Sequence, residues 1–396
     1  MKKELLFFAV LLILFVPVRT VASVRADTVI SLLTSYPGTD IYELEGHSAI
    51  RVNCGPGEDY AVSFGMFDFN APNFVYRFVK GETDYMVGKI PTNAFLYEYA
   101  RNNRRVEETP LNLNPEQKRR LIDLLEENLL PENRVYRYNY VKDNCATRPL
   151  AIIERAVADS LTLGKVDKSK IDDAATFREV MRHYHKNYPW YQFGIDLALG
   201  SGIDYKISDR EYAFVPMLMA QQVEDAEIAG MPLAGTTRVL VNFTPDQAVE
   251  NPTPWYLSPD AVCWCVFLFL LWATVRDIKR RRVTRWVDAV YFGILGMLGL
   301  LLTFLIFISV HEATSPNWLY LWLNPLCLIP PIFIWLKKCN IVVFWYQIIN
   351  FALILFMLVS WTWIPQSANS AFWPLVLGDL MRSANYIYIS RLKIER

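Results

Sequence analysis

Two residues in the first half of the chain could form a thiol-based catalytic pair. Cys145 follows Asp143 and Asn144, which are favoured helix-capping residues, and an amphipathic helical pattern comes after Pro149. We therefore expect Cys145 at the start of a helix, where backbone N–H groups lower the pKa of a thiol and can bind an oxyanion. His47 is the expected base, because a cysteine nucleophile needs a nearby group that takes its proton.

Other interpretations of these residues stay open. Cys145 could be a small buried thiol, or it could form a disulfide with Cys54 in an oxidising compartment. His47 could be a strand histidine without a catalytic role. The spacing of His183 and His185 could suit a metal, but no third ligand is evident, so we predict that no metal is bound.

The segments around the two residues predict strands and helices in alternation. Residues 46–52 alternate as a strand does, and residues 60–65 form a second expected strand. A helix is expected to run from Asn114, as its cap, to about residue 130. The tyrosines within residues 136–140 recur at every second position, which predicts a third strand that ends just before the cysteine.

The distribution of apolar residues divides the chain into three parts. An apolar run at residues 5–18, followed by small residues, predicts a signal peptide at 1–26; an uncleaved N-terminal anchor is the alternative. Residues 27–256 have the composition of a soluble domain, which either form of the N-terminus would export. Residues 257–396 are dominated by long apolar runs and are expected to form a membrane domain.

Five apolar stretches in the membrane part are candidate spans. They comprise residues 257–275, 289–310, 318–336, 341–364 and 371–389. Lys and Arg residues follow the first, third and fifth stretches, whereas the other two connections contain none. Because basic loops stay in the cytoplasm, the preceding domain is predicted to lie outside and the C-terminus inside.

Polar residues within this membrane part are a second group of interest. Asp379, Arg382 and Asn385 are three residues apart and share one helical face. We expect them to form an internal ion pair or to lie on a tilted interfacial helix, with a functional cavity as the alternative. His311 is expected to be an interfacial loop histidine, and the alternative is that it faces the active site.

The overall charge argues against a nucleic-acid partner. The chain has 40 Lys and Arg residues and 40 Asp and Glu residues, so its formal net charge is zero. No strong field therefore attracts a polyanion. Hydrophobic residues make up 53% of the chain, which is consistent with a membrane protein.

Several stretches of the sequence resemble the Lnb-type lipoprotein N-acyltransferases, which join a periplasmic domain to a C-terminal membrane bundle. The similar stretches are residues 46–52 (GHSAIRV), 64–69 (FGMFDF), 73–81 (NFVYRFVKG), 143–149 (DNCATRP), 315–318 (SPNW) and 324–326 (NPL). They occur in the family's order. The order of histidine strand and cysteine helix also resembles permuted NlpC/P60 papain-like domains, including the lecithin:retinol acyltransferase group.

The resemblance implies an α+β papain-like exported domain and an all-α transmembrane bundle, with Cys145 as nucleophile and His47 as base. It also implies nearby support for the oxyanion and the histidine. The candidates are Asn144, Asp143 and Arg148 beside the cysteine, and Ser63, Asp68, Tyr60 and Asp59 on or beside the strand after the histidine.

The implied function is acyl transfer without a cofactor, in the bacterial inner membrane and with the catalytic domain in the periplasm. A phospholipid would donate the acyl chain through a cysteine thioester, and a diacylglyceryl-cysteine lipoprotein would accept it on its α-amino group. Two alternatives remain: a membrane-anchored NlpC/P60-like peptidoglycan cysteine peptidase, and a non-catalytic membrane scaffold or sensor.

Overall fold

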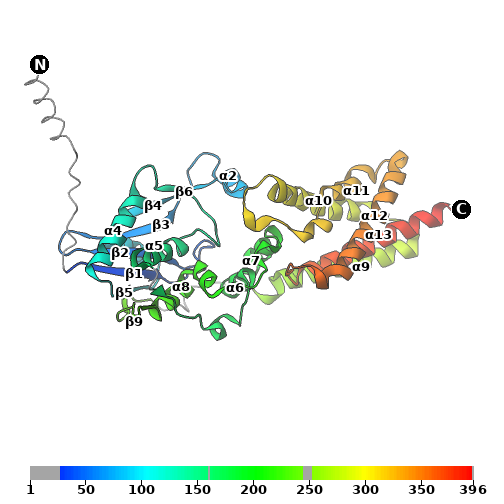
Figure 1. The fold of residues 1–396 in the computed structure, drawn as a ribbon. Coiled ribbons are helices and arrows are strands. Elements are labelled where there is room, and N and C mark those ends of the chain that lie inside the picture. The colour runs from blue at the N-terminus through cyan, green and yellow to red at the C-terminus, as the bar shows by residue number, and fades with distance from the viewer. Residues whose placement is uncertain (1–26, 159–160, 244–251, 395–396) are drawn as a thin grey trace, which may run out of the picture.

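The computed structural model describes residues 27–158, 161–243 and 252–394. An α+β domain is followed by a bundle of helices, which projects from one end of that domain (Figure 1). The predicted combination of an α+β domain and a C-terminal helical bundle is therefore confirmed. The predicted signal peptide at residues 1–26 lies outside the described residues.

The α+β domain is built on a seven-stranded antiparallel sheet of order β10-β5-β1-β2-β3-β4-β6. Its strands are β1 (Val29–Ser35), β2 (His47–Asn53), β3 (Asp59–Met66), β4 (Asp84–Pro91), β5 (Val106–Pro110), β6 (Val135–Arg137) and β10 (Arg238–Val241). In the centre, Leu32 of β1 is paired with Ile50 of β2, which is paired with Val62 of β3. The two strands predicted around His47 and after it are thus confirmed as β2 and β3.

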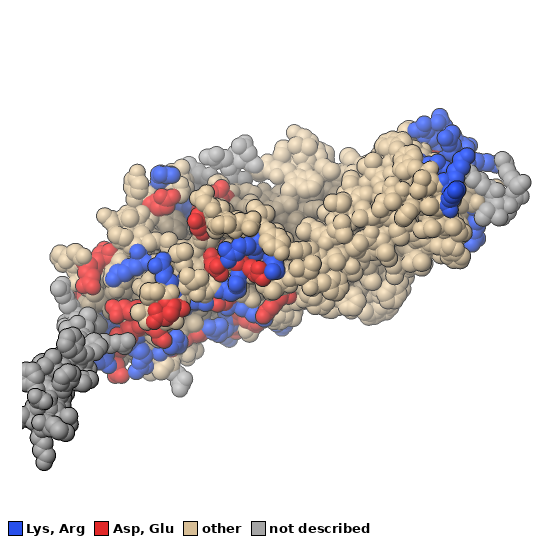
Figure 2. Space-filling model, turned by 90° about the horizontal axis from the view of Figure 1, so that it is seen from above, with Lys and Arg blue, Asp and Glu red and all other residues tan. Residues whose placement is uncertain are grey.

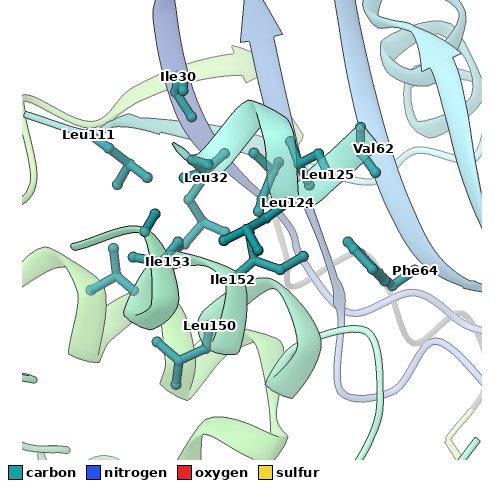
Figure 3. Close-up of a cluster of buried hydrophobic side chains, with 14 of the residues drawn as sticks. Ile30, Leu32, Val62, Phe64, Leu111, Leu124, Leu125, Leu150, Ile152 and Ile153 are labelled. Atoms are coloured by element: carbon teal, nitrogen blue, oxygen red, sulfur yellow. The ribbon is translucent and has the colours of Figure 1, made fainter. Parts of the chain in front are cut away.

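Helices cover both faces of this sheet. On one face lie α4 (Pro115–Leu129), α5 (Thr147–Val157) and α8 (Pro216–Glu224), and on the other lies α3 (Thr92–Arg101). The remaining helices of the domain, α2 (Phe74–Lys80), α6 (Phe177–Tyr184) and α7 (Pro189–Ala198), lie toward the bundle (Figure 1). The main core lies between the sheet and helices α4 and α5, where Leu125 and Ile153 meet Leu32 (Figure 3). The other face of the central strands packs against Phe95 of α3. Three very short strands, β7 (Leu161–Thr162), β8 (Glu227–Ile228) and β9 (Met231–Pro232), form a separate small sheet.

Helix α4 begins where its capping residues predict. The Asn114 side chain accepts a hydrogen bond from the Gln117 backbone N–H at 2.9 Å, and the Gln117 side chain accepts one from the Asn114 N–H at 3.0 Å. This reciprocal pair satisfies two N–H groups that a helix end otherwise leaves without partners. The prediction of a capped start at Asn114 is confirmed.

The predicted tyrosine strand is shorter than expected. Strand β6 ends at Arg137, so of the three tyrosines only Tyr136 lies in it. Asn139 and Asp143 instead close a tight turn through two backbone hydrogen bonds, of 3.0 and 2.9 Å. This turn leaves Tyr138 and Tyr140 outside the sheet and directs the chain into the Cys145 segment.

Three of the described helices are long and apolar enough to cross a membrane: α9 (Pro259–Arg280), α10 (Arg285–Phe307) and α12 (Asn340–Ser360). They correspond to the first, second and fourth predicted spans. Figure 2 shows acidic and basic side chains over the α+β domain, and Lys and Arg at the far end of the bundle. The surface between these two regions is uncharged in this view, as a membrane-crossing region requires.

The third and fifth predicted spans differ from continuous apolar helices. The third is divided into three short helical pieces, Trp318–Leu321, Pro325–Leu328 and α11 (Ile329–Phe333). Prolines at 325, 330 and 331 cause this division, because each lacks the N–H that a helix interior needs. The fifth is one helix, α13 (Phe372–Ile394), but it carries buried charged residues.

Those charged residues are paired inside the bundle. Arg382 is fully buried and donates hydrogen bonds to Asp288 of α10 at 2.6 Å and to Asp277 of α9 at 2.8 Å. Asp379 accepts a hydrogen bond from Asn350 of α12 at 2.5 Å. Arg382 of α13 therefore forms an internal ion pair, but its partners are Asp277 of α9 and Asp288 of α10 rather than Asp379 of its own helix.

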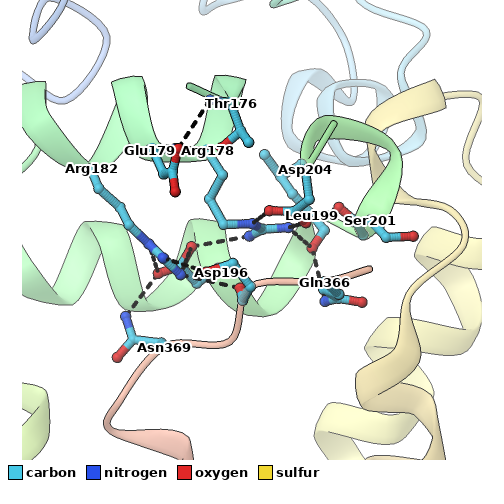
Figure 4. A network of polar contacts seen from close by, with 12 residues as sticks. Thr176, Arg178, Glu179, Arg182, Asp196, Leu199, Ser201, Asp204, Gln366 and Asn369 are labelled. Atoms are coloured by element: carbon cyan, nitrogen blue, oxygen red, sulfur yellow. Dashed lines mark hydrogen bonds and ion pairs between the residues drawn. The ribbon is translucent and has the colours of Figure 1, made fainter. Parts of the chain in front are cut away.

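Polar contacts also join the α+β domain to the bundle (Figure 4). Asp196 of α7 is fully buried, forms ion pairs with Arg178 and Arg182 of α6, and accepts a hydrogen bond from Asn369 at 2.9 Å. Arg182 also donates to the Ser367 hydroxyl at 2.7 Å. Because Ser367 and Asn369 precede α13, these bonds hold the domain against the bundle.

The buried cluster on α13 leads to a stability prediction. Arg382→Leu leaves two carboxylates buried without their cation, which should cost about 3–5 kcal/mol of stability. We expect a clearly lower thermal transition for the purified protein in detergent. Arg391→Leu, on the exposed side of the same helix, is the matched control and should change little. Equal transitions for the two variants would contradict the structural role of Arg382.

Candidate active site

His47 begins strand β2, and the residue before it must be a glycine. Gly46 has φ +83°, and a Cβ added there would lie 2.5 Å from the carbonyl oxygen of Ser35. His47 Nε2 is 2.8 Å from Ser63 Oγ on β3, so Ser63 is the one predicted support that contacts the histidine. Burial, with a smaller contribution from Arg104, lowers the pKa of His47 to about 3. The imidazole is therefore neutral in the resting protein, because burial disfavours its protonated form.

Cys145 lies two residues before helix α5, in a turn that Asn144 holds. The Asn144 side chain donates to the carbonyl oxygens of Tyr140 and Phe214, at 2.7 and 2.8 Å. Its oxygen accepts from the N–H groups of Ala146 and Thr147, at 2.8 and 2.9 Å. Asn144 is thus a positioning residue, and its amide N–H groups are already used within the fold.

Strand β2 contacts Cys145 through the residue that follows the histidine. The Ser48 hydroxyl donates to the Cys145 carbonyl oxygen at 2.5 Å. The paired register of β2 and β3 ends at Ala49 and Ser63, which leaves the Ser48 N–H to face the Cys145 sulfur. Among the described residues, no hydrogen bond joins the His47 imidazole to the thiol.

The surroundings of the Cys145 sulfur have opposing effects on its pKa. The Tyr138 hydroxyl and the N–H groups of Ser48 and of Cys145 itself favour the thiolate. Burial outweighs these donors and raises the pKa of the thiol to about 11. The prediction that the helix start lowers this pKa is therefore wrong, because burial destabilises the thiolate more than the three hydrogen-bond donors stabilise it.

A second glycine, Gly65, packs directly against Cys145. Gly65 of β3 has φ +85°, and a Cβ added there would lie 3.2 Å from the Tyr138 ring and 3.5 Å from the Cys145 Cβ. Cys145 carries a free thiol. The thiol of Cys54 is buried elsewhere and accepts a hydrogen bond from the Thr28 hydroxyl at 3.6 Å. The alternative of a disulfide between the two cysteines is not observed.

The remaining support candidates beside these two residues are engaged elsewhere. Asp143 and Arg148 form a bidentate ion pair at 2.5 and 2.7 Å. The Arg148 guanidinium also lies 3.4 Å from the centre of the Tyr136 ring. Asp68 accepts from the Asn70 N–H in an exposed turn. These residues stabilise the cysteine turn and the β3–α2 loop without contacting His47.

Tyr60 and Asp59, the other residues considered on this strand, also have separate partners. Tyr60 lies under the Lys89 ammonium, which is 3.6 Å from its ring centre. Asp59 binds Arg51 at 2.6 Å.

The polar residues predicted around the membrane do not reach the site. His311 follows α10, and its Nε2 donates to the Phe78 carbonyl oxygen at 2.8 Å. This bond joins the loop after α10 to α2. Asp379 and Arg382 lie inside the bundle, as described above. His311 therefore lies in the loop after α10, in contact with α2.

Sequence patterns did not reveal a buried acid beside the site. Glu45 precedes Gly46, and burial raises the pKa of its carboxyl to about 8 despite a hydrogen bond from Tyr140. His185 Nε2 lies 3.6 Å from Glu45, and its Nδ1 is bonded to Gln192 at 2.8 Å. The position of Glu45, in the turn just before Gly46 and His47, was the available signal.

His183 and His185 were the two residues considered as metal ligands in the sequence. His183 lies at the surface and is bonded to Asp172 at 2.7 Å, whereas His185 is buried beside Glu45. Within the described ranges, no group of three potential metal ligands occurs. The two histidines therefore serve separate structural contacts.

The fit of Gly65 against Cys145 gives a mutational prediction. Gly65→Ala should cost about 1–2 kcal/mol through its left-handed backbone and should also displace Cys145, slowing its alkylation by iodoacetamide at least tenfold. Gly57→Ala is the matched control, since φ is +87° there and no atom lies within 4 Å of the added Cβ. If both variants slow alkylation equally, the contact with Cys145 is unimportant.

The raised pKa of Cys145 predicts an unusual pH profile. The thiolate fraction, and with it the alkylation rate, should rise continuously up to about pH 11, with no plateau at neutral pH. Tyr138→Phe removes a donor to the thiolate and should move the curve to higher pH. Cys145→Ala gives the background from other thiols, such as the exposed Cys265. A plateau below pH 7 would indicate a thiolate–imidazolium pair and contradict this prediction.

Comparison with known proteins agrees with this two-part architecture. The family described as Lnb N-terminal periplasmic domain matches residues 19–183, and the family described as Lnb transmembrane domain matches residues 251–393. Neither a curated protein nor a solved structure matches the chain. Together the two matches cover most of the chain. The chain therefore belongs to the Lnb family, as a membrane protein with a periplasmic domain.

Proposed function

We propose that the protein is a phospholipid-dependent lipoprotein N-acyltransferase that works through an acyl thioester on Cys145. The observation that carries this proposal is a free thiol with three donors around its sulfur, beside a strand that begins with a neutral histidine. Membership of the Lnb family supports this reaction class. In this proposal residues 27–256 act in the periplasm, and residues 257–396 hold them at the inner membrane.

In the first step, Cys145 attacks the ester carbonyl carbon of a phospholipid. His47 takes the thiol proton as the carbon–sulfur bond forms, and the N–H groups of Cys145 and Ser48 stabilise the oxyanion. The ester carbon–oxygen bond then breaks, and the proton passes from His47 to the leaving alkoxide. A lysophospholipid departs, and the acyl group remains on Cys145 as a thioester.

The second step transfers the acyl group to an amine. The α-amino group of a diacylglyceryl-cysteine lipoprotein attacks the thioester, and its proton moves to His47. The carbon–sulfur bond breaks, an amide forms, and His47 returns the proton to the Cys145 sulfur. Neither step requires an oxidant, a metal or an organic cofactor.

In this proposal the resting pair is uncharged, and the thiol proton moves to His47 only as Cys145 attacks the carbonyl carbon. A thiol with a raised pKa and an imidazole with a lowered pKa both remain uncharged in a buried site. The bond between His47 Nε2 and Ser63 leaves Nδ1 as the ring nitrogen that can take the proton. Ser63 is thus the orienting residue in this proposal.

Mass spectrometry of lipoproteins tests the proposal directly. In a strain that depends on this protein for N-acylation, Cys145→Ala and His47→Ala should abolish the N-linked acyl chain, and Ser63→Ala should reduce it about tenfold or more. Cys265→Ala, which changes an exposed cysteine of α9, is the matched control and should retain acylation. Normally N-acylated lipoproteins in the Cys145→Ala strain would refute the proposal.

A peptidase assay separates the rival enzymatic function. The purified full-length protein is incubated with muropeptides in the absence of phospholipid. We expect no cleavage, whereas cleavage that requires Cys145 would favour the peptidoglycan peptidase.

A further inference from the structure

Aromatic rings form a continuous row between the membrane bundle and the candidate nucleophile. In spatial order they are Phe78, Phe74, Phe67, Tyr85 and Tyr138, which together are called the aromatic track. Successive ring centroids along the track lie 6.0, 5.7, 5.1 and 4.3 Å apart. The Tyr138 hydroxyl, at the end of the row, faces the Cys145 sulfur.

The outer part of this row belongs to an exposed apolar surface. Phe69 is 58% exposed, and on helix α2 Val75, Tyr76 and Phe78 are 73%, 54% and 48% exposed. Contiguous apolar surface of this kind marks a binding or membrane-contact region. Residues 66–81, which contain these side chains, are called the lip.

The cationic side chains of the lip are held away from this apolar surface. Arg77 forms an ion pair with Asp84 at 2.6 Å, and Lys80 forms one with Glu82 at 2.7 Å. Helix α2 therefore presents an apolar surface, while its charges are neutralised within the domain.

The lip is attached to the end of a membrane helix. The Tyr76 ring lies 6.0 Å from the ring of Phe304 in α10, and the Val310 N–H donates to the Lys80 carbonyl oxygen at 2.9 Å. Gly81, with φ +80°, lets the His311 ring approach; a Cβ there would lie 3.2 Å from it. Helix α2 thus lies beside the domain-facing end of α10, between the domain and the bundle (Figure 1).

The inner end of the lip leads directly to the site. Met66 follows Gly65, the glycine against Cys145, and Phe67 is the track residue that contacts both α2 and Tyr85. The row of ring contacts therefore connects α2 to the residues around the Cys145 sulfur.

We propose that the lip inserts into the outer surface of the bilayer and guides one acyl chain of a phospholipid along the aromatic track to Cys145. This inference rests on the proposed function and names the route of its first substrate. The occupant is a membrane lipid chain because the surface is apolar, exposed and continuous with α10, a candidate membrane helix.

Photocrosslinking of the full-length protein in vesicles tests the route. The vesicles consist of phosphatidylglycerol with a small fraction of a phospholipid that carries a diazirine at the end of one acyl chain. After illumination, peptides from residues 66–81 should be labelled. Phe69→Ser combined with Val75→Ser should reduce this labelling, and acylation of Cys145 by the vesicle lipid, about tenfold.

Controls separate this inference from folding and from the proposed function. Tyr97→Ser removes an equally exposed aromatic residue from α3 and should change neither readout. The rate of Cys145 alkylation shows whether the double variant keeps its site intact. Acylation of Cys145 without labelling of residues 66–81 would contradict the proposed lipid route but would be consistent with the proposed acyltransferase function. Labelling of residues 66–81 without any acylation of Cys145 would support the lip and overturn the proposed function.

Discussion

The candidate site depends on the amide side chain of Asn144. Its four hydrogen bonds to backbone groups join the Tyr140 turn, the Phe214 segment and the first turn of α5. Because both ends of the amide are used, the residue after it can occupy only one position relative to the sheet. That residue is Cys145, and its sulfur consequently faces the open end of the β2–β3 ladder. Buried polar groups that are fully satisfied in this way specify a unique local structure.

Two glycines and a short ladder complete this constraint. Gly46 and Gly65 both adopt left-handed backbone conformations, and each lies against an atom that a side chain would displace. The ladder between β2 and β3 stops before Ser48, so that its N–H is directed to the sulfur. The site thus combines close packing with a few hydrogen-bond donors to the Cys145 sulfur. Burial is the stronger influence, and it keeps both the thiol and the imidazole neutral in the resting protein.

Sequence patterns predicted the elements better than the contacts between them. Local signals were sufficient for β2, β3 and the capped start of α4, because alternation and capping act over a few residues. The pKa of Cys145 could not be predicted, because burial depends on how α5, the sheet and the tyrosine turn pack together. Asn144 was expected near an oxyanion, yet its partners at Tyr140 and Phe214 come from the tertiary fold. The division of the third span follows from prolines visible in the sequence, whereas the partners of Arg382 lie on two other helices.

The proposed reaction requires Cys145 to carry the acyl group. The most direct measurement incubates the purified full-length protein with a phospholipid whose acyl chains are isotopically labelled, quenches it in acid, and locates the label by peptide mass spectrometry. We expect a labelled acyl group on the peptide that contains Cys145, its release by neutral hydroxylamine, and its absence in Cys145→Ala. Turnover of the phospholipid with no acyl group on Cys145, or with the label on another residue, would show that Cys145 is not the acyl carrier.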